Sequence, residues 1–179
     1  FAGIDHVDLK ACKERNIEVL NCPNYSNVAV SELVIGLTLN LLRKINQADS
    51  ATRNGQTNSL LIGEELNNKT IGIIGLGKIG NKTANLFNAF GCKVLAYQRK
   101  PINNPNVTQV TLDELLSQSD IISLHIPYNE ETYHFIDEDK INMMKKDAIL
   151  INCARGPVVD NIALAKALNE ERIKGAGID

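Results

Sequence analysis

A glycine-rich turn between an apolar run and a helix-compatible stretch constrains this chain more than any other feature. The segment Thr70–Gly80 has the sequence TIGIIGLGKIG, in which the apolar run leads directly into the pattern G-x-G-x-x-G. Gly75 permits a tight turn, Gly77 lets the backbone approach an anion closely, and Gly80 lets the next helix pack against the strand. Free N–H groups at the helix start point at the same place, so the segment predicts a phosphate cradle for a dinucleotide. The alternative is a strand–helix turn that only packs tightly.

Composition excludes several other classes of protein. The net charge of −2, with 22% charged and 44% apolar residues, is typical of a globular protein and shows no basic excess for nucleic acid. No apolar run is long enough to span a bilayer, so we expect no membrane partner. The four cysteines form no C-x-x-C pair and no metal-site spacing, which favours reduced thiols and a cytoplasmic location.

Strand-like and helix-like segments alternate from Thr70 to the end of the chain. The helix-compatible stretches begin at good capping residues, among them Thr111, Asp137 and Asp160. The apolar segments expected to be strands are 70–74, 93–97, 107–110, 120–125, 148–152 and 176–179. Continuous apolar strands are typical of a sheet buried on both faces, so the alternation predicts an α/β fold with a doubly wound parallel sheet.

The residues before Thr70 have a different pattern. Residues 1–24 are expected to be the edge of another domain, with a short helix capped by Asp8 and a strand over Ile17–Leu20. A helical pattern from Val30 to Arg53 is apolar on most of its circumference, so we expect it to be buried between domains or at a subunit contact. The polar segment 52–68 is expected to be a connection. A start without Met and an end inside a strand-like run suggest part of a longer protein.

The residues after the second strand bear on the choice of cofactor. Ligands of a doubly wound sheet bind beyond the carboxyl ends of its strands, and an NAD site usually has an acid about 20 residues after the glycines, which binds the ribose hydroxyls. Gln98 occupies that position without a charge, and Arg99 and Lys100 follow it. A 2′-phosphate would meet no repulsion there, which favours NADP or relaxed selectivity over strict NAD. The alternative is a solvated basic turn with no role in selection.

The ends of the later strands carry the other candidate residues. The proline of His125-Ile126-Pro127 forms a ledge under the cofactor, and we expect the histidine to be structural rather than an acid–base group. Arg155 can present a planar fork to a carboxylate, or form a structural ion pair. Cys153 is expected to be an apolar filler, since the sequence places no base beside it. Asp179 can accept a hydrogen bond from a carboxamide, or cap a helix.

Six segments together carry a resemblance to a known family. They are GIDHVDL, NCPNYSNVAVSEL, LNNKTIGIIGLGKIG, SLHIP, INCARGPVVD and IKGAGID. In order and spacing they resemble the D-isomer-specific 2-hydroxyacid dehydrogenases along essentially the whole chain. The resemblance implies that residues 1–27 end a flavodoxin-like substrate domain, that residues 28–53 are an interdomain helix, and that residues 54–179 are an incomplete NAD(P)-binding Rossmann domain. It also implies a homodimer.

The resemblance implies roles for individual residues as well. Arg155 matches the arginine that holds the substrate carboxylate, and Asp179 matches the aspartate that holds the nicotinamide carboxamide. The residues that match other cofactor-binding segments are Gly75, Gly77, Lys78, Ile79, Gly80, Ile126, Pro127, Cys153, Ala154 and Arg155, the last three in the segment that lines the nicotinamide. Gln98 departs from the family, which usually has a ribose-binding Asp there. The family's catalytic Glu and His lie downstream of the motif that ends this chain, so residues 1–179 are expected to lack both.

The implied reaction is reversible hydride transfer between the cofactor and a D-2-hydroxy acid or its 2-oxo acid, with NAD or NADP as cofactor. Three alternatives stay open. One is an NADH-sensing regulator of the same family, another is a different Rossmann protein such as a methyltransferase, and the third is a cofactor-binding module without a proton donor. The segment INCARG disfavours the methyltransferase. The substrate is open, with a slight similarity to hydroxypyruvate or glycerate reductases over Pro23–Ser26.

Overall fold

A single parallel sheet forms the centre of the molecule in the computed structural model, which describes residues 3–56 and 61–179. Its strands lie in the order β3-β2-β1-β4-β5-β6, and every neighbouring pair is parallel. The strands are β1 (Thr70–Ile74), β2 (Lys93–Tyr97), β3 (Thr108–Gln109), β4 (Ile121–Leu124), β5 (Ile149–Asn152) and β6 (Gly175–Ile178). The chain winds outward from β1 in one direction and then from β4 in the other, so the predicted doubly wound Rossmann-type sheet is confirmed.

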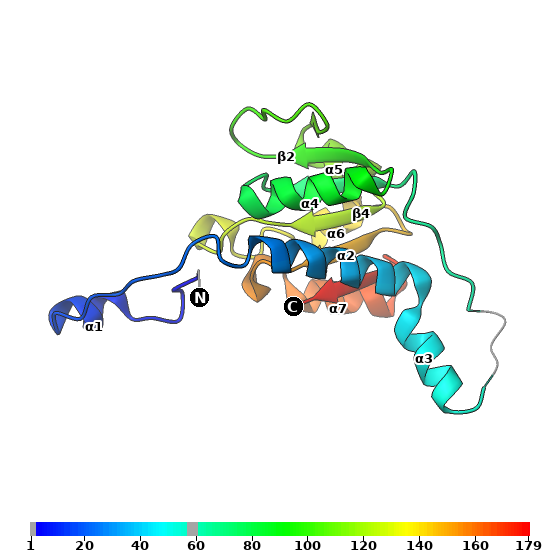
Figure 1. The fold of residues 1–179 in the computed structure, drawn as a ribbon, viewed down its shortest axis with the longest axis horizontal. Helices are drawn as coiled ribbons and strands as arrows, with labels where there is room; N and C mark the ends of the chain where they lie inside the picture. Colours follow the sequence, from blue (N-terminus) through cyan, green and yellow to red (C-terminus); the bar gives the residue numbers. More distant parts are fainter. Residues whose placement is uncertain (1–2, 57–60) are drawn as a thin grey trace.

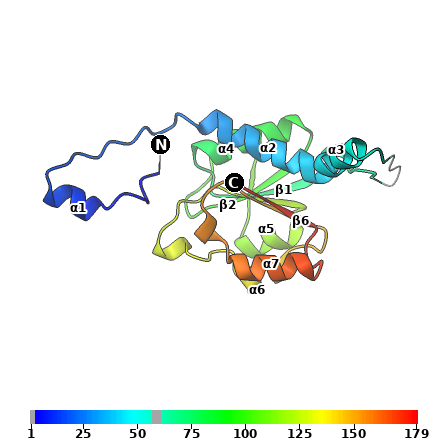
Figure 2. The ribbon, with the colours of Figure 1, turned by 90° about the horizontal axis from the view of Figure 1, so that it is seen from below.

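Helices cover both faces of the sheet (Figures 1 and 2). One face carries α2 (Asn27–Arg43) and α4 (Lys78–Ala89), and the other carries α5 (Leu112–Gln118), α6 (Glu138–Met143) and α7 (Asn161–Asn169). Two short 3-10 helices, η1 (Glu130–Thr132) and η2 (Gly156–Val158), follow β4 and β5. Each face has its own apolar core, and the central strands contribute to both, which explains why their sequences are continuously apolar.

The predicted helix caps are confirmed. Asp8 accepts a hydrogen bond from Ala11 N at 2.9 Å and opens α1 (Leu9–Glu14). Thr111 forms the expected capping box with Glu114 at the start of α5. Asp137 and Asp160 accept from backbone N–H groups in the first turns of α6 and α7. These side chains satisfy donors that a helix leaves unpaired at its start, which is why short helices form at these positions.

The strand expected over Ile17–Leu20 is wrong. These residues have irregular backbone, and Leu20 is 81% exposed. Within residues 3–26 the structure contains α1 and no strand. The part of this segment around α1 projects away from the sheet (Figure 1), so Ile17–Leu20 has no neighbouring strand in the described chain with which to form a ladder. An edge of a flavodoxin-like domain stays a prediction.

The long helix expected from Val30 to Arg53 is interrupted. Lys44 adopts a left-handed conformation with φ of 54°, so α2 ends at Arg43 and α3 (Ile45–Arg53) begins in a new direction. Helix α2 buries one face, whereas α3 buries no residue. The expectation of burial on most faces is therefore wrong for α3. Part of the predicted connection, residues 57–60, lies outside the described residues.

None of the described helices is long and apolar enough to cross a membrane.

Candidate functional site

The strand register brings the predicted site residues to one edge of the sheet. The last residues of five neighbouring strands are paired and form one row. In the order of the sheet they are Tyr97, Ile74, Leu124, Asn152 and Ile178. The next residue along each strand therefore lies at the same level, just beyond the carboxyl ends. These residues are Gln98, Gly75, His125, Cys153 and Asp179. Since the strand order reverses between β1 and β4, a crevice for a ligand is expected at this edge.

The glycine loop has the geometry of an anion cradle. Gly75 has φ of +92°, and its N–H donates to Tyr97 O at 3.0 Å. Gly77 is the N-cap of α4, and no side chain caps this helix start. Apart from Gly77 and its two chain neighbours, no described residue has an atom within 4 Å of the position that a Cβ on Gly77 would take, whereas a Cβ on Gly80 would collide with Gly75 O. Close packing at Gly80, open space at Gly77 and uncapped N–H groups fit a dinucleotide pyrophosphate.

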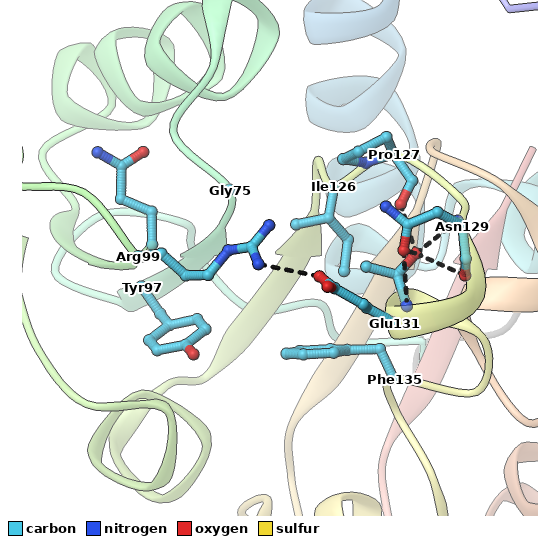
Figure 3. Close-up of a pocket in the computed structure, with 10 residues that line it drawn as sticks. Gly75, Tyr97, Arg99, Ile126, Pro127, Asn129, Glu131 and Phe135 are labelled. Atoms are coloured by element: carbon cyan, nitrogen blue, oxygen red, sulfur yellow. Dashed lines mark hydrogen bonds and ion pairs between the residues drawn. The ribbon is translucent and has the colours of Figure 1, made fainter.

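A pocket lies between the ends of β2 and β4, on one side of this loop (Figure 3). We call it the β2-side pocket. Gly75, Ile126 and Pro127 line it beside the glycine loop. Arg99 and Glu131 also line it, and Arg99 Nη1 lies 2.9 Å from Glu131 Oε2. Figure 3 shows the Arg99 guanidinium and the Glu131 carboxylate pointing toward each other.

Sequence reasoning did not find Glu131. Gln98 lines the β2-side pocket, and its side-chain Nε2 donates to Pro101 O at 3.3 Å, within its own turn. Of the described residues that line this pocket, Glu131 alone has a carboxylate. It comes from η1 rather than from a strand end, so the rule that directs attention to strand ends did not select it. The only local signal was the capping pattern Asn129-x-x-Thr132, which fixes η1.

A second pocket lies on the other side of the loop, near the end of β5, and we call it the β5-side pocket. Ile79, Pro127, Cys153 and Ala154 form part of its wall, and Asp5 and Arg155 contribute charges of opposite sign. Pro127 is shared between the two pockets. The β5-side pocket therefore continues the crevice past the glycine loop, as an extended dinucleotide requires.

Arg155 is held by an acid from the start of the chain. Its Nε donates to Asp5 Oδ2 at 2.7 Å, and its Nη1 donates to Ala154 O at 2.8 Å. The Arg155 guanidinium keeps the pKa of Asp5 below its usual value through this hydrogen bond. Asn152 fixes the backbone, because its Nδ2 donates to Arg155 O and its Oδ1 accepts from Ala154 N. The structure thus contains the ion pair that the sequence left open for Arg155, and 43% of the arginine side chain stays exposed.

Burial makes His125 and Cys153, at this edge of the sheet, poorly suited to proton transfer at neutral pH. His125 Nε2 lies 2.9 Å from Ser123 Oγ, and burial lowers the pKa of His125 to about 4. Burial, with the nearby Asp179 carboxylate, raises the pKa of the Cys153 thiol to about 11. These environments support the structural interpretation of His125 and the filler interpretation of Cys153. Asp179 is exposed beyond β6, and its N–H donates to Asn152 O at 3.1 Å.

Comparison with known proteins gives a consistent picture. The model of the D-isomer specific 2-hydroxyacid dehydrogenase NAD binding domain matches residues 35–179. A glyoxylate reductase of Thermofilum pendens is 44% identical over 187 residues, covering 99% of this chain and 55% of that protein.

Two solved structures are also similar. An acyclic imino acid reductase in complex with NADPH and D-Arg has 42% identity and a TM-score of 0.91, covering 99% of this chain and 59% of that one. A D-lactate dehydrogenase from Aquifex aeolicus, complexed with NAD and lactic acid, has 38% identity and a TM-score of 0.88, covering 99% and 55%. The chain thus spans little more than half the length of these relatives.

Proposed function

The chain belongs to the D-isomer-specific 2-hydroxyacid dehydrogenase family, and from this premise we propose that it forms the cofactor-binding part of an oxidoreductase. The proposed reaction transfers a hydride between a nicotinamide cofactor and a D-2-hydroxy acid or its 2-oxo acid. One observation carries the proposal. The open cradle at Gly77 and the Arg155 guanidinium lie at the same edge of the sheet, and Ile79, in the first turn of α4, lines the same pocket as Arg155. A phosphate site and a carboxylate site are therefore adjacent.

Arg155 is proposed to hold the substrate carboxylate. A guanidinium binds a carboxylate through parallel N–H donors, and this charge-assisted pairing fixes orientation as well as affinity. Asp5 and the Ala154 carbonyl occupy two of its nitrogens and restrict the direction of the fork. The same positive charge would polarise the adjacent 2-oxo group of the substrate. When bound, the nicotinamide ring supplies or accepts the hydride.

The remaining site residues are proposed to bind the cofactor. The backbone of Gly77, Lys78 and Ile79 would receive the pyrophosphate, since these residues form the uncapped start of α4. Ile126, Pro127, Cys153 and Ala154 would flank the cofactor, and Asp179 would accept from the carboxamide. The β2-side pocket would receive the adenosine. We propose NAD or NADP as the cofactor, with Gln98, Arg99 and Lys100 favouring NADP because the usual ribose-binding acid is missing from that turn.

We assign proton transfer to groups other than His125 and Cys153. With pKa values of about 4 and about 11, His125 and Cys153 lie far from the range of an efficient acid–base catalyst at neutral pH. We propose the domain boundaries 1–27, 28–53 and 54–179. The first segment would end the substrate domain, and the second, which contains α2 and α3, would connect the two domains. Exposed apolar side chains on α2, Val28 and Leu33, support a contact with another domain or subunit. A cytoplasmic homodimer is part of the proposal.

A turnover screen of the intact protein tests the proposed function. NADH and NADPH would be crossed with pyruvate, hydroxypyruvate, glyoxylate and branched 2-oxo acids. We expect oxidation of at least one reduced cofactor that depends on a 2-oxo acid. Arg155→Lys should reduce kcat/KM strongly while cofactor binding is retained, and Arg53→Lys, at an exposed pair on α3, is the matched control. Cofactor binding without turnover of any 2-oxo acid would favour the NADH-sensing regulator instead.

A further inference from the structure

The β2-side pocket contains an ion pair with no part in the proposed hydride transfer. Arg99 approaches from the end of β2 and Glu131 from η1, and 32 positions separate them in the sequence. Their side chains meet across the pocket in which the adenosine is proposed to bind (Figure 3). An anionic and a cationic group are therefore both presented to the ribose end of a dinucleotide.

Two well-fixed turns bring this pair together. On one side, Gln109 Nε2 donates to the carbonyls of Gln98 and Lys100, both at 3.2 Å, and so fixes the backbone around Arg99. On the other side, Asn129 and Thr132 close a capping box around η1. In addition, Thr132 Oγ1 donates to Pro127 O at 2.7 Å. The positions of both backbones are thus set independently of the ion pair.

The pair itself opens easily, because its side chains are 80% and 71% exposed. Exposed ion pairs contribute little to folding, so a bound anion can replace the carboxylate on Arg99. A 2′-phosphate would compete with Glu131 for this guanidinium and would be repelled by the carboxylate. A ribose 2′-hydroxyl, in contrast, can donate a hydrogen bond to Glu131, as it does to the acid of an ordinary NAD site.

Building on the proposed cofactor site, we propose that Glu131 is a specificity-determining residue that holds Arg99 away from a 2′-phosphate. The turn after β2 has Gln98 where an acid is usual, and Glu131 brings a carboxylate to the same pocket from η1. Glu131 thereby limits the preference for NADP that Arg99 and Lys100 would otherwise give. Neutralising Glu131 releases Arg99 and shifts the protein toward NADPH.

Equilibrium binding tests this proposal without any need for turnover. The dissociation constants of NADH and NADPH would be measured from nicotinamide fluorescence in the intact protein. Glu131→Gln removes the charge and keeps the shape, and should increase NADPH affinity relative to NADH by about tenfold, equivalent to about 1.4 kcal/mol. Glu130→Gln is the matched control, since Glu130 lies on the same turn but does not line the pocket. Its affinity ratio should equal that of the wild type.

The same substitution in a protein that already carries Arg99→Gln shows whether Glu131 acts through Arg99. If Glu131 acts partly by holding Arg99, Glu131→Gln should change the affinity ratio less in a protein that already carries Arg99→Gln, where only the direct effects of the carboxylate on the 2′-phosphate and on the ribose hydroxyl remain. An undiminished change in that background would overturn the proposed role of Arg99. A Glu131→Gln ratio equal to that of the wild type would overturn the whole inference and leave the cofactor site intact. If neither NADH nor NADPH binds the wild type, the proposed function fails together with the inference. Both side chains are exposed, and a thermal unfolding curve verifies that each variant is folded.

Discussion

Three glycine-to-alanine variants, each tested alone, distinguish the glycines needed for cofactor binding from those needed for packing. A Cβ on Gly77 meets no described residue beyond its two chain neighbours within 4 Å, and φ at Gly77 is −71°, which alanine adopts freely. Gly77→Ala should therefore change the unfolding free energy by no more than about 1 kcal/mol, the size of an N-cap effect. The methyl group would occupy the space through which a pyrophosphate approaches the backbone. We expect NADH affinity to fall at least about tenfold, or about 1.4 kcal/mol.

Two control variants complete this experiment. Gly80→Ala would place a methyl group against the Gly75 carbonyl, a backbone atom that cannot move aside alone. We expect a loss of about 1–3 kcal/mol in unfolding free energy, the usual cost of overpacking, together with weaker binding. Gly36 lies within α2, away from the cradle, and a Cβ there meets no other part of the described chain, so Gly36→Ala should leave NADH affinity unchanged. Urea unfolding and fluorescence titration measure the two quantities. A Gly77→Ala protein that binds NADH as tightly as the wild type would refute the cradle.

Two further predictions concern the dependence of stability on pH. Burial lowers the folded pKa of His125 to about 4. As the pH decreases, the unfolded chain therefore binds a proton on this histidine before the folded chain does. The free energy of unfolding should decrease by up to about 3 kcal/mol between about pH 6.5 and pH 4. His125→Gln should remove this decrease in urea unfolding. Asp120 accepts from Thr70 N at 2.8 Å and from Lys145, and these bonds lower its pKa although burial alone would raise it. Its stabilising contribution is therefore present above the unfolded pKa of about 4 and is lost as the pH falls through the lower folded pKa. Asp120→Asn should be less stable at pH 7, and a pH 7 stability equal to that of the wild type would contradict this.

Features set by local interactions were predictable from the sequence. The glycine loop, the caps at Asp8, Thr111, Asp137 and Asp160, and the continuously apolar strands each depend on residues close together in the chain. Alternation of strands and helices then leads to the parallel sheet, since few other connections are feasible. The order of the sheet also brought the predicted residues to one edge.

Features that depend on distant partners were not predictable in the same way. Ile17–Leu20 has strand composition, but a strand needs a neighbour, and the described chain offers none. Lys44 breaks the long helix although it is neither glycine nor proline, so the sequence had no ordinary break signal there. The pairs Arg99–Glu131 and Arg155–Asp5 join residues 32 and 150 positions apart. Only the tertiary structure brings these charges together.

The central claim is that Arg155 recognises a substrate carboxylate beside the cofactor. The most direct measurement compares kcat/KM for a 2-oxo acid and for its neutral amide, such as pyruvate and pyruvamide, in the intact wild-type protein and in Arg155→Ala. The wild type should strongly prefer the acid, and the variant should lose most of that preference while its NADH dissociation constant stays unchanged. An Arg155→Ala protein that still discriminates between acid and amide as the wild type does would contradict the account.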